Sequence, residues 1–520
     1  MERESFSSRL GFILISAGCA IGLGNVWRFP FVTGQYGGAS FVLIYLCFLL
    51  LLGLPIMVAE FAVGRASRRS PAKSFDTLEP KGTKWHLFKY VTIAGNIILM
   101  MFYTTVSGWM LYFLYKMAVG DLSGLDAQGI KGVFGALLQD PATMAGNMAI
   151  IIMLCFGVCY MGVRNGVERI TKIMMAFLIV LMVVLAANSM LLPGSEAGLK
   201  YYLYPDFDKI AEHGVREVIF AAMGQAFFTL SIGMGSLSIF GSYIGKEQKL
   251  TNEALWIMFL DTFVAIVAGL IIFPACFSFG IQPDAGPNLL FITLPNVFNA
   301  MNGGRIWGTL FFLFMLFAAM STVIAVFEMI ISSICELTGG DRRRLIPFAV
   351  IGMILLSLPC VFGFNIWSGF EPLGKGTCVL DLEDFLVSNN ILPLGSLIFL
   401  AFCTSRYGWG WNKFIEEVDT GKGIGFPKWM RFYATYILPL IVLYIFFNGY
   451  YAMFFKYKIS KNKTSKIVVF RYCLAHFLCA ARFIFFYSWL CSSSSLACCT
   501  ASTLSPIANC FSFSEKAGPP

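Results

Sequence analysis

The chain has 520 residues, of which 58% are hydrophobic and 13% charged, and its mean hydropathy is +0.74. These values exclude an ordinary soluble globular protein and indicate a polytopic membrane protein. The formal net charge is +9, but the basic residues gather in loops between apolar spans, so no nucleic-acid partner is expected.

Eleven apolar spans follow one another along the sequence, and most have the ~20 residues needed to cross a bilayer. They cover roughly residues 10–33, 39–63, 88–120, 146–161, 170–193, 215–242, 251–281, 305–336, 346–363, 385–405 and 432–455. Every second loop is basic, beginning with 64–89. The positive-inside rule therefore predicts a cytoplasmic amino terminus. We expect a multi-pass protein of the plasma or inner cell membrane.

The first and sixth spans each carry a pair of glycines in the middle of an apolar run. Residues 21–24 read Ile-Gly-Leu-Gly, and residues 232–235 read Ile-Gly-Met-Gly. Glycine destabilises a helix interior by about 1 kcal/mol relative to alanine, so these pairs predict interrupted helices. Backbone freed inside a membrane must line a cavity or be buried in protein. Two such breaks in corresponding halves are typical of a transporter's central binding site.

The two motifs divide the core into spans 1–5, roughly residues 9–193, and spans 6–10, roughly 215–405. Because five is odd, the second half enters the membrane in the opposite sense, which predicts an inverted repeat. Span 11, roughly 432–455, lies outside the repeat and completes a transporter core of residues 1–455. Residues 456–520 differ in composition. Either 467–490 is a poor twelfth span or, as we favour, this tail is foreign to the fold, for example an out-of-frame extension.

Six segments carry motifs in a fixed order: Arg9–Pro30, Gly37-Gly38-Ala39, Pro55–Glu60, Ala226–Gly235, Phe291–Pro295 and Leu380–Asp384. Together they resemble the neurotransmitter:sodium symporter family, in particular its bacterial eleven-helix amino-acid transporters. The resemblance covers about residues 3–455. It implies an all-α polytopic membrane protein of LeuT-type fold, a 5+5 inverted repeat with discontinuous spans 1 and 6, plus span 11.

Biogenic-amine transporters of the family hold the amine with an aspartate at the position that Gly22 occupies here. Glycine therefore favours an amino acid over a decarboxylated amine. Amides freed at the first break suit a carboxylate, to which Tyr103 would donate a hydrogen bond. The aligned pocket is mostly apolar and predicts an aromatic or branched substrate. The implied substrate-binding residues are Ala20, Gly22, Leu23, Gly24, Leu99, Tyr103, Phe228, Thr229, Ser231, Met234, Thr322 and Val326.

The resemblance also implies two sodium ions, bound by carbonyl, hydroxyl and carboxylate oxygens. The first site would use Ala20, Asn25, Thr229 and Asp261 with the substrate carboxylate, and the second Gly18, Ile21, Ala318, Ser321 and Thr322. Taken alone, the last two residues could instead hydrogen-bond to the preceding turn of their own helix.

Asp261 lies ten residues into an apolar span, where an acid is by default a functional hypothesis. Chloride-dependent relatives have a neutral amide near this position and a serine one turn later, where this chain has Ala265. Tyr45, Gln225 and Thr229 match the other members of the chloride site. We expect the Asp261 carboxylate to supply the negative charge, so that chloride is not required. The alternative is a buried carboxyl that stays protonated.

Charge pairs are expected to gate the two mouths of the transport path. Arg28 and Asp384 match the extracellular pair of the family. Arg3 and Glu336 match the intracellular pair, which Tyr243 would support. Ion pairs in contact with water are only weakly stable, which suits a gate that must open.

The sequence therefore predicts a sodium-coupled amino-acid symporter that works by alternating access, with the lipid bilayer and an amino acid as its partners. A transport-incompetent amino-acid sensor with the same fold is the alternative. A channel would need a continuous filter. An enzyme would need a catalytic constellation, which the three separated histidines do not supply. No catalytic residue is expected, and the oligomeric state stays open.

Overall fold

The structure of the chain, a computed structural model, describes residues 6, 8–280, 289–451 and 453. The predicted gate residue Arg3 and the predicted tail at 456–520 lie outside the described residues. Within the described part the chain is helical, and its β structure is limited to one bridge between Gln248 and Lys422. This confirms the all-α prediction.

Nine helical stretches of the described residues are long and apolar enough to cross a membrane. They are Ala39–Ser67, Trp85–Val119, Pro141–Tyr160, Val163–Met190, Leu250–Ser278, Gly304–Thr338, Arg342–Phe362, Val379–Thr404 and Met430–Tyr450. Their main helices are α3 (Ala39–Phe48), α4 (Leu54–Ser67), α6 (Phe88–Val119), α8 (Pro141–Tyr160), α9 (Arg169–Met190), α14 (Leu250–Ser278), α16 (Gly304–Thr338), α17 (Arg342–Phe362), α18 (Val379–Leu386), α19 (Leu392–Thr404), α21 (Met430–Phe432) and α22 (Leu438–Tyr450). All nine correspond to predicted spans.

The two remaining predicted spans, the first and the sixth, are both interrupted. In the first, α1 (Arg9–Ala20) and the stretch Gly24–Gln35, which ends in α2 (Phe29–Gln35), meet at an angle of 54°. In the sixth, α12 (Val215–Thr229) and α13 (Ser236–Gly241) are separated by six non-helical residues. The prediction that both helices break at their paired glycines is therefore confirmed.

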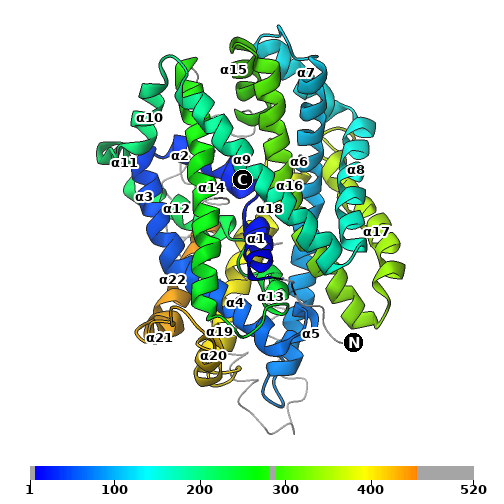
Figure 1. The fold of residues 1–520 in the computed structure, drawn as a ribbon, viewed down its shortest axis with the longest axis vertical. Helices are drawn as coiled ribbons and strands as arrows, with labels where there is room; N and C mark the ends of the chain where they lie inside the picture. The colour runs from blue at the N-terminus through cyan, green and yellow to red at the C-terminus, as the bar shows by residue number, and fades with distance from the viewer. Residues whose placement is uncertain (1–5, 7, 281–288, 452, 454–520) are drawn as a thin grey trace, which may run out of the picture. The chain divides into compact units, whose positions relative to one another are not determined.

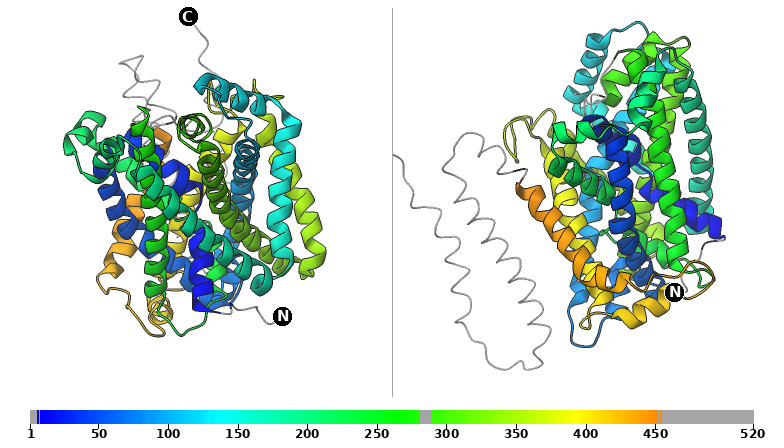
Figure 2. Two further views of the ribbon diagram at one scale, coloured as in Figure 1. Left: turned by 45° about the horizontal axis from the view of Figure 1, so that its top comes forward. Right: turned by 90° about the vertical axis from the view of Figure 1, so that its left-hand side faces the viewer.

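Shorter helices connect the spans and lie at the two ends of the bundle. One end, at the top in Figure 1, carries α7 (Ala127–Gln139), α10 (Ser195–Leu203), α11 (Phe207–His213) and α15 (Leu294–Ala300). The other end carries α5 (Pro71–Leu78) and α20 (Trp411–Val418). The views in Figures 1 and 2 agree that α8 and α17 lie at one side of the bundle and α3 and α22 at the opposite side.

Proline explains a recurring local feature, the widened π-helical turn. Five such turns lead directly into a helix that has proline at one of its first two positions. Proline lacks an N–H and its ring clashes with the carbonyl four residues earlier, so the preceding turn widens. The turns are η1 (Gly24–Arg28), η2 (Leu49–Gly53), η5 (Leu289–Thr293), η6 (Val387–Ile391) and η7 (Tyr433–Ile437).

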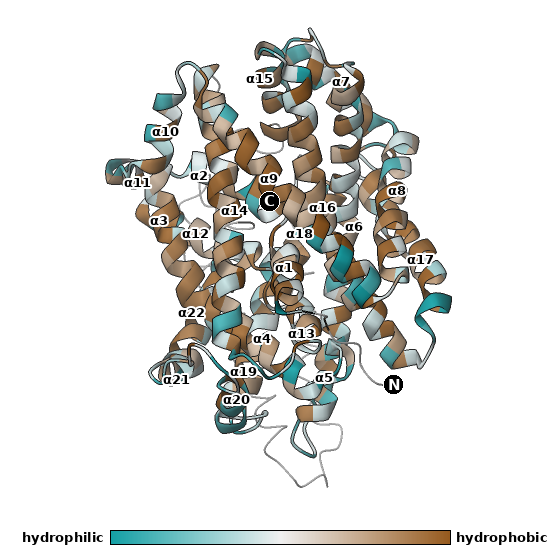
Figure 3. Cartoon of the chain, in the orientation of Figure 1, coloured by the Kyte–Doolittle hydropathy of each residue, from teal (hydrophilic) through white to brown (hydrophobic). Residues whose placement is uncertain are grey.

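The outer faces of the bundle are apolar, as contact with lipid requires. On α17, Phe348 is 74% exposed and Leu355 60% exposed, and on α9 Val180 is 60% exposed. Figure 3 shows hydrophobic residues along the long helices and hydrophilic residues gathered at α10, α11 and α20. Many large apolar side chains exposed along the long helices mark a membrane-facing region rather than a water-facing one. The broken helix α1 is inside, packed against α9, α13, α14 and α16.

Candidate functional site

The first break, at residues 21–23, is held by side chains from neighbouring helices. The N–H of Leu23 donates to Oη of Tyr103, on α6, at 2.9 Å. The carbonyl of Gly24, which also accepts the backbone N–H of Phe29, accepts a second hydrogen bond from Nε2 of Gln225, on α12, at 2.9 Å. Protein groups therefore satisfy the Leu23 N–H that the helix no longer pairs and help to fix the start of the second half-helix, as burial inside a membrane requires.

The second break is longer and its backbone is unusual. Ser231 has a φ of 50° and Gly233 a φ of 92°, both in the left-handed region. The carboxylate of Glu60, on α4, accepts a hydrogen bond from the N–H of Gly233. Nδ2 of Asn96, on α6, donates to the carbonyl of Met234 at 2.9 Å. Two buried polar side chains thus replace the helical hydrogen bonds that the break removes.

A cavity lies between the two breaks. Three of the predicted substrate-binding residues, Leu23, Thr229 and Val326, are buried near it but are not part of its lining. Two residues that the sequence did not indicate, Val387 and Leu392, complete its wall from the tenth span. The nine predicted residues that line the cavity are Ala20, Gly22, Gly24, Leu99, Tyr103, Phe228, Ser231, Met234 and Thr322.

Asp261 joins the first break to α14 and α12. Nδ2 of Asn25 donates to Oδ1 of Asp261 at 2.8 Å and to its backbone carbonyl at 3.0 Å. Oγ1 of Thr229 lies 3.3 Å from Oδ2 of Asp261. Oδ1 of Asn25 in turn accepts the N–H of Gly22 at 3.1 Å. All three side chains are fully buried, so the structure brings together the three polar side chains predicted for the first sodium site.

Ser321 and Thr322 face the carbonyls at the end of α1. Oγ of Ser321 lies 3.1 Å from the carbonyl oxygen of Gly18, 3.4 Å from that of Ile21 and 2.9 Å from that of Ala318. Oγ1 of Thr322 lies 3.2 Å from the carbonyl oxygen of Gly18 and 3.1 Å from that of Ile21. Two hydroxyl groups have only two protons, and so cannot donate in all five contacts at once. Five converging oxygens with too few protons suit a hard cation.

The predicted outer gate residues lie near the cavity but are not joined. The guanidinium carbon of Arg28 lies 4.3 Å from the ring centroid of Phe228. Asp384 accepts a hydrogen bond from Oγ of Ser388 at 2.7 Å. Within the described ranges, no ion pair links Arg28 to Asp384. Their role as a gate therefore stays a prediction.

At the opposite end, the predicted inner gate residues contact other partners. Glu336 accepts hydrogen bonds from the N–H and Oγ of Ser70, at 3.1 and 2.7 Å, where α5 begins. Tyr243 donates to Oε1 of Glu328 at 2.8 Å, and Glu328 also forms an ion pair with Arg342. Tyr243 thus contacts α16 two turns before Glu336. The predicted role of these residues in gating is not tested by these contacts.

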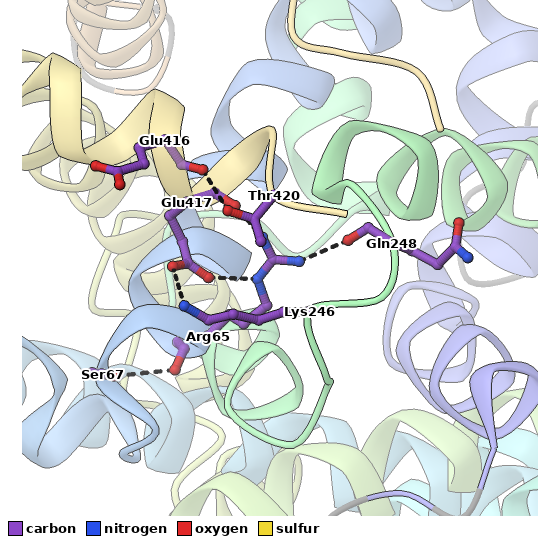
Figure 4. A network of polar contacts seen from close by, with 8 residues as sticks. Arg65, Ser67, Lys246, Gln248, Glu416, Glu417 and Thr420 are labelled. Carbon is purple, nitrogen blue, oxygen red and sulfur yellow. Dashed lines mark hydrogen bonds and ion pairs between the residues drawn. The ribbon is translucent and has the colours of Figure 1, made fainter. Parts of the chain in front are cut away.

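A buried arginine ties three segments together at this end. Arg65, at the end of α4, has a fully buried side chain. Its Nε donates to Oε1 of Glu417, on α20, at 2.6 Å, and its Nη1 donates to the carbonyl of Gln248 at 2.8 Å (Figure 4). Lys246 adds a second ion pair to Glu417 at 3.0 Å. The buried charge of Arg65 is thus paired with a carboxylate and with backbone carbonyl groups. These contacts hold α20 and the 246–248 segment against α4.

Two broken helices that meet around a cavity, inside a bundle with apolar outer faces, define the class of multi-pass membrane transporters. The model of the sodium:neurotransmitter symporter family matches residues 3–125 and 130–491, and the chain belongs to this family. The family is one of transporters rather than enzymes.

Relatives of similar length include sodium-dependent transporters described as uncharacterized. One from Bacillus subtilis is 33% identical over 85% of this chain and 97% of its own length. One from Haemophilus influenzae is 31% identical over 86% of this chain and 98% of its own length. Sodium dependence is thus a property of these relatives.

A crystal structure of MhsT in complex with L-phenylalanine has a similar fold. The two structures superpose with a TM-score of 0.76 and 34% sequence identity, over 86% of this chain and all of MhsT. This similarity confirms the predicted LeuT-type fold with its discontinuous first and sixth spans.

Proposed function

We propose that the chain is a symporter that uses sodium to carry a hydrophobic amino acid, aromatic or branched, across the plasma or inner membrane by alternating access. The observation that carries the proposal is the convergence of Ser321 and Thr322 on carbonyls of the broken helix α1. A cation there would bind only when α1 and α16 are together. Ion binding is thereby coupled to the conformation of the break that lines the cavity.

The cavity wall supports an amino acid as the substrate. Oη of Tyr103 accepts the Leu23 N–H and so keeps its own proton to donate to a carboxylate. Leu99, Met234 and Leu392 contribute apolar surface to the same wall. The related structure of MhsT contains L-phenylalanine, a substrate of the chemistry proposed here.

Two sodium ions fit the oxygen clusters at the first break. The cluster of Asn25, Thr229 and Asp261 adjoins the cavity, so a substrate carboxylate could complete it with Ala20. The cluster at Ser321 and Thr322 needs no substrate atom. Inward movement of each ion supplies about 2.3 kcal/mol per 100 mV of membrane potential, before any concentration gradient.

Asp261 supports chloride-independent transport, because it supplies a fixed negative charge beside Asn25. Sodium-driven uptake should continue undiminished when gluconate replaces chloride in the medium. Strict dependence of uptake on chloride would refute this part of the proposal.

Uptake of radiolabelled L-phenylalanine into proteoliposomes, with sodium or with choline outside, tests the function. We expect the proteoliposomes to accumulate L-phenylalanine above its equilibrium concentration only when sodium is outside. The Ser321→Ala variant should need a sodium concentration at least about tenfold higher for half-maximal uptake, because it removes one of five cation ligands. Ser333→Ala, buried on the same helix and outside the cluster, is the matched control. Sodium-dependent binding without accumulation would favour the sensor alternative, and equilibration alone would favour a channel.

A further inference from the structure

Three acids lie within four residues of one another on α18, and they differ in how they are satisfied. Oδ2 of Asp381 accepts the N–H of Cys378 at 2.7 Å, and Oδ1 of Asp384 accepts Oγ–H of Ser388 at 2.7 Å. Glu383 is only 4% exposed, and within the described ranges neither of its carboxyl oxygens accepts a hydrogen bond from a backbone N–H, a hydroxyl group or a charged side chain. No sodium or substrate role was predicted for Glu383 from the sequence.

The surroundings of Glu383 supply no positive charge. The elements packed against α18 include α6, α17 and η6. From α17 the thiol of Cys360 faces the carboxyl, and Thr105 of α6 lies beside that thiol. Oγ1 of Thr105 donates to the carbonyl of Met101 in its own helix, at 3.0 Å. The turn η6 contains no titratable residue, and none of the ion pairs in the described part of the chain includes Glu383.

A short path of backbone connects Glu383 to the cavity. The N–H of Val387 donates to the carbonyls of Glu383 and Asp384. Val387 itself lines the cavity, as does Leu392 further along the same span. A substrate that moves Val387 therefore moves the backbone of Glu383 as well.

We propose that Glu383 is a proton-binding site coupled to the substrate site. An ionised carboxylate buried with only a thiol, a weak donor, against it is strongly unfavourable, so the neutral, protonated form is the one that fits here. When movement of the tenth span hydrates the group, its proton passes to water, and when the span closes the carboxyl takes a proton from water again. This inference rests on the proposed function, since it assigns a second, proton-coupled component to the same substrate cycle.

The sign of the pH effect follows from this cycle. If the substrate-bound, closed conformation holds the proton more tightly, substrate binding takes up a proton from solution. Substrate affinity is then highest at acidic pH. It falls as the pH rises, because the open conformation gives up the proton to water first, and it levels off once the carboxyl is ionised in both conformations.

Binding of radiolabelled L-phenylalanine to the purified full chain, in saturating sodium from about pH 6 to about pH 8.5, tests this coupling. We expect the dissociation constant of the wild type to rise about tenfold, equivalent to about 1.4 kcal/mol. The Glu383→Gln variant, which keeps a neutral side chain at every pH, should hold the acidic value throughout. Glu371→Gln, an exposed acid in the preceding loop, should keep the wild-type slope.

A flat wild-type profile, or a Glu383→Gln variant that keeps the wild-type slope, would overturn the coupling. A second measurement separates this failure from failure of the proposed function. Infrared spectra of the substrate-free protein at about neutral pH should contain the C=O band of a protonated carboxyl that Glu383→Gln removes. Absence of that band refutes the proton site whether or not any amino acid binds. Absence of sodium-dependent binding of all hydrophobic amino acids, with the band present, refutes the proposed function and the coupling but leaves the proton assignment standing.

Discussion

The two helix breaks share a Gly-x-Gly pattern, but their glycines serve different physical purposes. Gly22 and Gly24 do not have left-handed backbone angles, whereas Gly233 and Gly235 have φ values of 92° and 76°. A Cβ at Gly22 would lie 2.2 Å from Oη of Tyr103. Glycine is therefore required for space at the first break and for backbone conformation at the second.

The two breaks also differ in which atoms surround their glycines. The atoms that would meet a Cβ at Gly22 belong to the side chains of Tyr103 and Thr322, which can move. Those that would meet a Cβ at Gly233 include the backbone carbonyl of Leu392, 2.2 Å away. Both breaks contribute to the cavity wall, but only at Gly233 is the glycine confined by backbone as well as by conformation. Changes at the first should mainly affect binding, and changes at the second mainly folding.

The largest expected effect is that of Gly233→Ala. Alanine at a left-handed φ costs about 1–3 kcal/mol, and the clash with the backbone of Leu392 adds to this cost because it requires α13 or α19 to shift. We expect little folded protein and a clearly lower melting temperature, measured by size-exclusion chromatography of the heated, detergent-solubilised protein.

The matched control for this substitution is Gly224→Ala, on α12. A Cβ there would have no atom within 4 Å, and the residue is helical. Alanine is a better helix former than glycine, so this variant should melt at or slightly above the wild-type temperature. Equal melting temperatures for the two variants would show that the second break does not depend on the conformation of Gly233.

The next effect is that of Gly22→Ala, which should change binding rather than stability. Its melting temperature should match that of the Gly224→Ala control, since Tyr103 and Thr322 can move aside. Substrate affinity should fall at least about tenfold, equal to 1.4 kcal/mol, because the displaced hydroxyls lose their positions in the cavity wall. Equilibrium binding of L-phenylalanine measures this.

A double-mutant cycle sharpens this prediction. Tyr103→Phe removes the oxygen that a Cβ at Gly22 would meet, so the two substitutions should be non-additive. Tyr103→Phe should cost less affinity in the Gly22→Ala background than in the wild type. Additive losses would mean that the two residues do not interact across the break.

Most of the first break could be predicted from the sequence, because its chemistry is carried by residue types that are rare inside a membrane. Asp261 is an acid in an apolar run, and Ser321 with Thr322 is a polar pair in another. The motifs around them fix which segments meet. The structure brings these residues to the two sides of the first break, as the motifs indicated.

The remaining cavity residues and the partner of Tyr243 could not be predicted, because they depend on how each helix is rotated and how deep it lies in the bundle. Val387 and Leu392 face the cavity across the π turn η6, and such a turn changes the face that later residues present. Glu328 and Glu336 are eight residues apart on α16 and share roughly one face, so spacing alone does not decide which of them meets Tyr243. A proline follows five of the π turns, and Pro393, just after η6, is the sequence signal that could have indicated the changed face of Val387 and Leu392.

The smallest expected effect, with the opposite sign, is that of Ser231→Gly. Ser231 has a φ of 50°, which costs a residue with a Cβ about 1–2 kcal/mol. Glycine removes this strain but loses roughly 0.5–1 kcal/mol through the greater freedom of the unfolded chain, so a net gain of about 0–1.5 kcal/mol remains. Ser231→Ala, which removes the hydroxyl and keeps the strain, should not be stabilised. If Ser231→Gly instead lowers the melting temperature as Gly233→Ala does, left-handed backbone conformation is not what distinguishes the second break from the first.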